Sequence, residues 1–197
     1  MIAITFSGKA QHGKDTTAKY MKEELERLGR KVIILHFADY LKYVCKEYFN
    51  WNGIKDEKGR TILQKVGTDL ARNNNPDIWV DTVKNFILAF ETEFDYFLVP
   101  DCRFPNEIEV LKRDGRIDFF YAIKVKRDNF DNGLTEEQKN HPSETALDNY
   151  KFNFIVIDNE EGLDYVKSNA RQVAQTIDFK SNDDIGFKNY PVYDLLF

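Results

Sequence analysis

Short apolar runs and amphipathic segments alternate along most of the chain. The apolar runs have the length of buried strands and are rich in branched and aromatic residues. The expected strands occupy residues 2–6, 31–37, 96–99, 119–125 and 152–157. Because strands that alternate with helices form parallel sheets with right-handed crossovers, this pattern predicts an α/β domain around a five-stranded parallel sheet.

Apolar residues spaced three and four apart mark the helices between these strands. Gly29 is expected to end the first helix, Asp39 to cap the second, and Pro76 to lie near the start of the fourth. The apolar face of the fourth helix, which includes Phe86 and Phe90, is expected to be buried. The segments with helical spacing are residues 18–28, 39–48, 61–72, 76–90, 105–113 and 163–177.

The first strand leads into a glycine-rich turn that carries the clearest chemical signal in the chain. Gly8, four further residues, Gly13 and Lys14 lie between this strand and the first helix, in the P-loop arrangement. Glycines let the backbone approach a phosphate, the helix N-terminus attracts anions, and the lysine adds a mobile positive charge. Asp15, followed by Thr16, takes the place of the usual Ser or Thr, so the metal-binding arrangement differs from that of an ordinary P-loop ATPase. A ligand-free turn is the alternative interpretation.

Composition and charge narrow the class of protein. A chain of 197 residues favours a single domain, with room for an inserted lid. A net charge of −5 without a basic stripe argues against a nucleic-acid polymer as partner. We expect no signal peptide, because Met1 leads straight into a strand, and no membrane span, because no apolar run is long enough. A cytoplasmic protein with reduced Cys45 and Cys102 is therefore expected.

Polar residues gather where the expected strands end, and parallel sheets bind ligands at that edge. Asp101 follows an apolar strand, where it could lie near Mg²⁺ or could be an ordinary turn or helix-capping residue. Arg103 beside it has the planar fork that suits bidentate phosphate contact. The segments expected to share one cleft are residues 7–16, 37–42, 101–103 and the loop that begins at residue 126.

Other candidate residues each allow two interpretations. Arg60, Gln64 and Thr68 recur every four residues, so they share a helix face that meets either solvent or a small ligand. The charged segment 126–148 is either a lid over phosphates or a plain surface loop. His36, near the end of an apolar strand, is interpreted as a core histidine rather than a catalytic one.

Several short polar segments, beginning with the P-loop, follow one another in a fixed order: residues 8–17, 37–42, 63–69, Trp79, 99–107 and 141–144. Their combination resembles the deoxynucleoside monophosphate kinases of tailed bacteriophages and their prophage relatives. The resemblance implies phosphoryl transfer from ATP to a deoxynucleoside monophosphate, giving ADP and the diphosphate. It also implies an α/β P-loop three-layer sandwich. Residues 1–179 would form one kinase domain, with a helical acceptor-binding region at 38–92, a lid at 126–148 and a tail at 180–197.

Carried over residue by residue, the resemblance implies three groups of site residues. The ATP phosphates and Mg²⁺ would be held by Gly8, Lys9, Gly13, Lys14, Asp15, Thr16 and Thr17, with Asp15, Thr16 and Asp101 as metal ligands. The catalytic residues would be Asp101 and Arg103, which would lie between the two nucleotides, together with Lys14 and Arg127. We expect Lys14, Arg103, Arg127 and Mg²⁺ to surround the migrating phosphoryl group. The acceptor nucleotide would be bound by Phe37, Asp39, Lys42, Arg60, Gln64, Thr68, Arg72, Trp79, Glu107, Ser143 and Glu144.

Two other functions remain open on the sequence. One is a kinase for a different small acceptor, such as dephospho-coenzyme A or a ribonucleoside monophosphate. The other is a regulatory module that binds ATP without turning it over, although the pair of Asp101 and Arg103 argues against it. The apolar end of the tail could also serve a homodimer.

Overall fold

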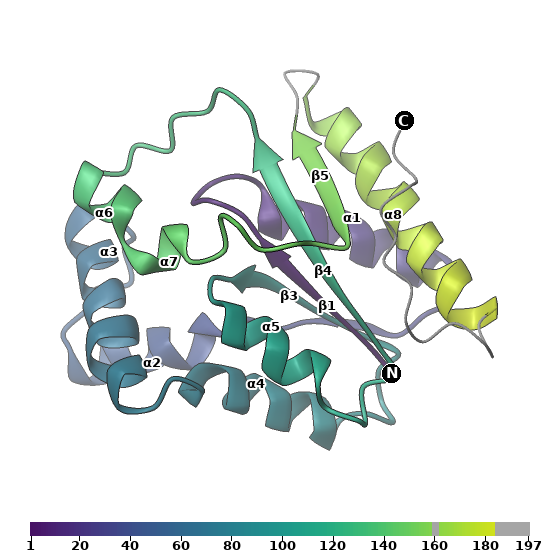
Figure 1. Ribbon diagram of the computed structural model, residues 1–197, viewed down its shortest axis with the longest axis horizontal. Coiled ribbons are helices and arrows are strands. Elements are labelled where there is room, and N and C mark those ends of the chain that lie inside the picture. Colours follow the sequence, from purple (N-terminus) through teal and green to yellow (C-terminus); the bar gives the residue numbers. More distant parts are fainter. Residues whose placement is uncertain (159–161, 184–197) are drawn as a thin grey trace.

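The computed structural model describes residues 1–158 and 162–183. Its five strands are all parallel and form one sheet in the order β2-β3-β1-β4-β5, which confirms the expected sheet (Figure 1). The strands are β1 (Ile2–Ser7), β2 (Val32–Ile34), β3 (Tyr96–Cys102), β4 (Phe119–Arg127) and β5 (Phe154–Asp158).

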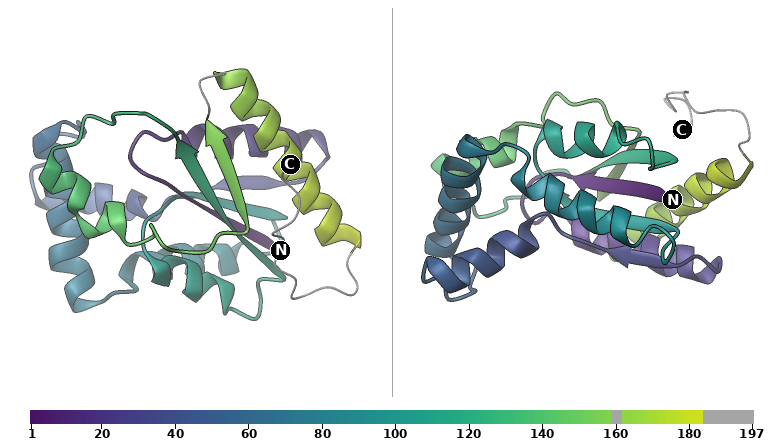
Figure 2. Two further views of the ribbon diagram at one scale, coloured as in Figure 1. Left: turned by 45° about the horizontal axis from the view of Figure 1, so that its top comes forward. Right: turned by 90° about the horizontal axis from the view of Figure 1, so that it is seen from below.

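Helices cover both faces of the sheet and give the expected three layers (Figure 2). Helices α1 (Lys14–Arg27) and α8 (Leu163–Asp183) lie on one face, and α4 (Ile78–Ala89) and α5 (Pro105–Lys112) lie on the other. The remaining helices gather beyond the carboxyl ends of the strands (Figure 1): α2 (Ala38–Tyr48), α3 (Glu57–Gln64), the π-helix η1 (Lys65–Arg72), α6 (Glu136–Asn140) and α7 (Pro142–Thr145).

Strand β3 shows why the sheet could be recognised from the sequence. Tyr96 and Leu98 pack on the side of α1 and α8, whereas Phe97 and Val99 pack on the side of α4 and α5. All four side chains are at most 1% exposed. Since successive residues of a strand point to opposite faces, a strand that is covered on both sides is apolar throughout.

Two helix predictions need correction. Phe86 and Phe90 are 37% and 40% exposed, and their rings lie 4.5 Å apart on the outer side of α4 rather than in the core. The third helix begins at Glu57, ahead of the segment 61–72 that was expected to be helical, and its second half is the π-helix η1. Asp56 explains the early start, because its side chain caps α3 by accepting the N–H of Gly59 at 2.7 Å.

The segment 126–148 contains more structure than the expected irregular connection. Thr135 caps α6, and the ring of His141 caps α7. At the other end of the chain, α8 continues through residues 180–183, which were expected to begin the tail. The apolar end of the tail lies outside the described residues, so its part in a homodimer stays a prediction. Within the described ranges, no helix combines the length and the apolar character that a membrane span requires.

Candidate functional site

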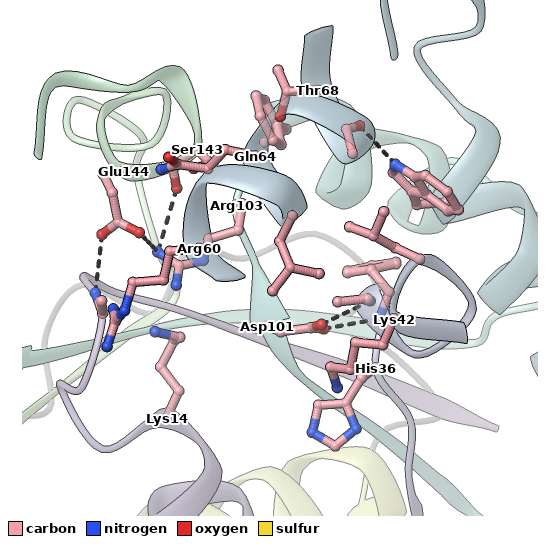
Figure 3. Close-up of a pocket in the computed structure, with 18 of the residues that line it drawn as sticks. Lys14, His36, Lys42, Arg60, Gln64, Thr68, Asp101, Arg103, Ser143 and Glu144 are labelled. Carbon is pink, nitrogen blue, oxygen red and sulfur yellow. Dashed lines mark hydrogen bonds and ion pairs between the residues drawn. The ribbon is translucent and has the colours of Figure 1, made fainter. Parts of the chain in front are cut away.

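A cleft of about 420 Å³ opens at the carboxyl edge of the sheet (Figure 3). Its walls come from the P-loop, the end of β3, the helices α2, α3 and η1, and the short helix α7. This is the edge at which the sequence placed the site. The predicted site residues that line the cleft are Lys14, Asp15, Phe37, Lys42, Arg60, Gln64, Thr68, Arg72, Trp79, Asp101, Arg103, Glu107, Ser143 and Glu144.

The P-loop takes a backbone course that only glycine allows at two positions. Gly13 precedes α1 with a φ of 87°, in the left-handed region. A Cβ atom on Gly8 would lie 2.2 Å from the carbonyl oxygen of Val125 on β4. The loop therefore folds tightly against the end of the sheet.

Lys14 is buried beneath this loop. Its Nζ donates hydrogen bonds to the carbonyl oxygens of Gly8, at 2.9 Å, and Lys9, at 2.8 Å. Burial, and next the nearby guanidinium of Arg103, lower the pKa of Lys14 to about 7. A cation that is both desolvated and close to another cation is stabilised by an incoming anion, which suits a phosphate-binding role.

Asp15 reaches the cleft and contacts His36. Oδ1 of Asp15 lies 2.9 Å from Nε2 of His36, and Nδ1 of His36 lies 3.4 Å from Oδ2 of Asp39. The hydrogen bond between Asp15 and His36 raises the pKa of His36 and lowers that of Asp15. Since His36 lines the cleft, its interpretation as a core histidine is wrong (Figure 3). Asp39 does not line the cleft, and it reaches the site through His36 and through Lys42, whose Nζ lies 2.7 Å away.

The residues expected to hold Mg²⁺ are not equally placed for it. Thr17 is fully buried, and within the described residues its hydroxyl has no hydrogen-bond partner. Thr16 lies in the first turn of α1 and does not line the cleft. Asp15 is open, with 77% of its side chain exposed. Mg²⁺ that is bound to nucleotide phosphates needs only one or two carboxylates and keeps several waters, so an open Asp15 beside the P-loop fits this ion.

Asp101 caps helix α2. Its two carboxylate oxygens accept the backbone N–H groups of Phe37 and Ala38, each at 2.9 Å. These N–H groups belong to the start of the helix and have no partner within it. The expected cap, Asp39, lies inside the first turn, so that prediction is wrong. The capping role is thus the one that the structure shows for Asp101, and it holds the carboxylate at the floor of the cleft.

Glu107 has a buried carboxylate that contacts two arginines that line the cleft. It accepts the backbone N–H of Arg103 at 2.6 Å and that of Phe104 at 3.0 Å, and it forms an ion pair with Arg72. Burial raises its pKa, an effect that Arg72 opposes. The guanidinium of Arg72 also lies 4.2 Å from the ring centroid of Phe104. Glu107, 1% exposed, therefore fixes the position of Arg72 and of the Arg103 backbone.

The segment 141–145 lies against the P-loop. Nη1 of Arg103 pairs with Oε1 of Glu144 at 2.6 Å, and Oε2 of Glu144 accepts the N–H of Ala10 at 3.0 Å (Figure 3). Lys9 donates to the backbone oxygen of Glu144 at 2.6 Å. Nδ1 of His141 lies 2.9 Å from the hydroxyl of Ser143. The Glu144 carboxylate thus fills a place between an arginine and a P-loop N–H in which an anion is well bound.

The polar face of α3 and η1 forms the opposite wall. Arg60, Gln64 and Thr68 all line the cleft, so this face meets the cavity rather than open solvent (Figure 3). The helix is held from behind by Trp79, which is 4% exposed and donates its indole N–H to the carbonyl oxygen of Gly67 at 2.9 Å. Contact of this face with a ligand stays a prediction.

Arg127 does not share the cleft with Lys14. It lies in a neighbouring hollow of about 170 Å³ that also contains Arg103 and Glu144. Its guanidinium lies 4.0 Å from the ring centroid of Phe130, and its backbone N–H donates to Nδ1 of His12 at 3.2 Å. Arg127 therefore does not lie among the cations of the cleft, where it was expected.

Two titratable residues that line the cleft were not selected from the sequence as site residues, His36 and Lys55. His36 follows β2, so the rule that ligands bind at the carboxyl edge could have selected it. Lys55 lies in the loop between α2 and α3, a polar stretch without periodicity, and no sequence signal distinguishes it from its neighbours.

A model of the deoxynucleotide monophosphate kinase family matches residues 37–170 of the chain. No curated protein matches it. Among solved structures, the Mycobacterium tuberculosis APS kinase CysC in complex with AMPPNP and APS is similar with a TM-score of 0.50 and 9% identity, covering 89% of this chain and 96% of that chain. Shikimate kinase from Acinetobacter baumannii in complex with shikimate has a TM-score of 0.39 and 13% identity, covering 92% and 94%. At this identity the likeness to APS kinase shows a shared fold alone.

Proposed function

The chain belongs to the deoxynucleotide monophosphate kinase family, and we propose that it transfers the terminal phosphoryl group of ATP to a deoxynucleoside monophosphate, giving ADP and a deoxynucleoside diphosphate. Membership makes it a nucleotide monophosphate kinase; the deoxynucleotide acceptor and the residue roles are our proposal. The observation that carries it is that Lys14 of the P-loop, Arg103 and the polar face of α3 and η1 line one cleft.

The donor side is formed by the P-loop. ATP would place its phosphates on the loop N–H groups and beside Lys14, as P-loops do. It would then take the place that the Glu144 carboxylate holds against Ala10, so Glu144 would move or turn when ATP binds. The hollow that contains Arg127 and His12 continues from the loop, and the guanidinium of Arg127 would contact the donor nucleotide there.

The acceptor side is formed by α2, α3 and η1. Arg60 and Arg72 would bind the monophosphate, because a guanidinium matches phosphate oxygens with two parallel hydrogen bonds. Gln64 and Thr68 offer neutral hydrogen bonds on the same wall. Residues 38–92 thus act as the acceptor-binding region of a single kinase domain.

Phosphoryl transfer requires in-line positioning, neutralisation of charge and exclusion of water. Lys14 and Arg103 would neutralise the charge on the migrating group. When bound, Mg²⁺ would neutralise the donor phosphates, with Asp15 as its protein ligand. Water would be excluded by the lid, residues 126–148. Gln138 of this segment is 5% exposed, and its Nε2 donates to the carbonyl oxygen of Glu57, at the start of α3, at 3.4 Å. Glu144 of the same segment contacts the P-loop, so the segment touches both sides of the cleft.

A panel of acceptors tests the proposal. The purified chain is given ATP with each of the four common deoxynucleoside monophosphates, each ribonucleoside monophosphate or dephospho-coenzyme A, and ADP release is measured. We expect turnover with at least one deoxynucleoside monophosphate and little ADP release without an acceptor. The Lys14→Ala variant, which lacks the P-loop cation, is expected to be inactive and serves as the background control.

The other outcomes separate the remaining functions. Turnover confined to a ribonucleotide or to dephospho-coenzyme A would assign a different acceptor to the same cleft. Tight ATP binding without product on any acceptor would indicate a regulatory module. Fast ADP release without an acceptor would indicate an ATPase, and each of these results would overturn the proposal.

A further inference from the structure

Lys55 is a cation of the cleft that neither the sequence nor the family comparison assigns to a role. It lies in the loop between α2 and α3 and lines the cleft. The charged groups that act electrostatically on its ammonium group are Lys42 on α2, Asp15 at the start of α1, and Asp101 and Arg103 at the end of β3. Lys55 therefore reaches the region in which the donor and acceptor sides meet.

The backbone on both sides of Lys55 is fixed. The indole N–H of Trp51, which is 5% exposed, donates to the carbonyl oxygen of Ile54 at 2.9 Å. Nε of Arg60 donates to the carbonyl oxygen of Lys55 itself at 3.0 Å. Asp56 then caps α3. The loop thus holds one lysine at a defined place on the rim, while its side chain remains free to turn toward a ligand.

Among the described residues, none forms a hydrogen bond or an ion pair with the ammonium group of Lys55, although Asp15 and Asp101 act on it electrostatically. The other lysines of the cleft are engaged, since Lys14 donates to P-loop carbonyls and Lys42 pairs with Asp39 at 2.7 Å. Partial burial, and next the charge of Lys42, lower the pKa of Lys55, an effect that the carboxylates of Asp15 and Asp101 oppose. An anion that enters the cleft would supply the missing partner.

We infer that Lys55 binds the phosphate of the acceptor nucleotide from the loop between α2 and α3. The inference rests on the proposed function. Lys55 leads into α3, and the loop carbonyl that precedes the helix is held by Arg60, a residue that we place on the acceptor phosphate. A lysine is a compact charge on a flexible stem, so it can follow a phosphate without a fixed fork geometry. Lys55 and Arg60 would then hold the acceptor phosphate together.

The test compares Lys55→Gln with Lys58→Gln. Lys58 lies three residues further on, is exposed, and does not line the cleft, so it is a matched control for the loss of one lysine charge. Binding of each of the four deoxynucleoside monophosphates, and of the corresponding deoxynucleosides without phosphate, is measured by calorimetry. Because a charge-assisted hydrogen bond is lost, Lys55→Gln should weaken monophosphate binding roughly tenfold to a hundredfold. Binding of the nucleosides should not change.

Steady-state kinetics give a second readout. Lys55→Gln should raise the KM for the acceptor while the KM for ATP stays as in the wild type, and Lys55→Arg should restore most of the loss. Lys55→Met removes the charge with a side chain of similar length, and it replaces Lys55→Gln should that variant unfold. Unchanged monophosphate binding in Lys55→Gln would overturn the inference, as would an equal loss for nucleosides and monophosphates.

The same measurements separate this inference from the proposed function. Turnover by the wild type together with unchanged acceptor kinetics in Lys55→Gln would overturn the role of Lys55 alone. Monophosphate binding that depends on Lys55, without turnover in the wild type, would overturn the proposed function and uphold the role. Absence of monophosphate binding in the wild type would overturn both.

Discussion

Arg103 and Glu144 form an ion pair, with 2.6 Å between Nη1 and Oε1, that joins the end of β3 to the segment lying against the P-loop. The second oxygen of the same carboxylate accepts the N–H of Ala10 at 3.0 Å. One acidic side chain thus contacts both the arginine and the phosphate-binding loop. Because Arg103 is held near the loop before a nucleotide binds, little of its side-chain entropy is lost when it engages a phosphate.

Replacement of Arg103 should reduce the rate of phosphoryl transfer. Loss of one preorganised charge-stabilising group costs about 3 kcal/mol in the transition state, so Arg103→Ala should lower kcat roughly a hundredfold. Arg113→Ala is the matched control, because the Arg113 side chain is 79% exposed and lies at the end of α5. Wild-type turnover in Arg103→Ala would show that Arg103 does not act on the reacting group.

Removal of the Glu144 charge should strengthen ATP binding. The carboxylate competes with the donor phosphates for the N–H of Ala10, and repulsion between like charges at short range in water is about 1 kcal/mol. Glu144→Gln should therefore lower the Kd for ATP about fivefold. Glu137→Gln, an exposed position on α6, is the control. Weaker ATP binding in Glu144→Gln would mean that the carboxylate supports the donor site instead of competing with it.

The parts of the fold that depend on residues close together in the sequence could be predicted from the sequence. Each strand is an apolar run, and the P-loop is a local pattern between a strand and a helix. The cap of α2 shows the limit of this approach. Asp39 is the acidic residue that is near in sequence, but Asp101, which is 63 residues from Ala38, provides the cap because β3 ends beside the helix. Such a contact exists only once the sheet has formed.

The site shows the same division. Lys14 and Arg103 could be selected from their places after strands, and both line the cleft. Lys55 has ordinary sequence surroundings, and tertiary packing alone brings it to the cavity. His36 follows β2, so the carboxyl-edge rule could have selected it, although its place near an apolar run led to its interpretation as a core residue. Arg127 is the last residue of β4, yet it lines the neighbouring hollow and not the cleft. The position of a residue at the sheet edge was predictable, and the cavity that it lines was not.

Loss of Glu107 should lower the free energy of unfolding. Its carboxylate pairs with Arg72 and accepts two backbone N–H groups, those of Arg103 and Phe104. Glu107→Ala would leave these groups buried and unpaired, which costs about 3 kcal/mol in the free energy of unfolding. Denaturant unfolding measures this loss, and the exposed Glu47→Ala should show almost none. Equal stability of the two variants would contradict the positioning role of Glu107.

Glu24 makes the stability of the fold sensitive to acid. This buried carboxylate of α1 accepts hydrogen bonds from Arg27 and, at 2.6 Å, from Gln175 of α8, so it joins the two helices on one face of the sheet. The hydrogen bond from Arg27, opposed by burial and supported by Gln175, lowers the pKa of Glu24 from 4.5 to about 2. A carboxylate whose pKa is lower in the folded state contributes stability that is complete above the unfolded pKa.

This contribution should therefore be present at neutral pH and decline as the pH falls from about 5 toward 2. Its size is on the order of 2 kcal/mol, because hydrogen bonds to a charged group are among the stronger ones in proteins. Glu24→Gln should reduce the free energy of unfolding at pH 7 by this amount and should flatten its dependence on pH in the acid range. Glu23→Gln, at an exposed neighbouring position, should leave the wild-type profile unchanged. Parallel profiles for the wild type and Glu24→Gln below pH 5 would show that other groups cause the acid sensitivity, because a side chain changes the slope only if it binds different numbers of protons in the folded and unfolded states.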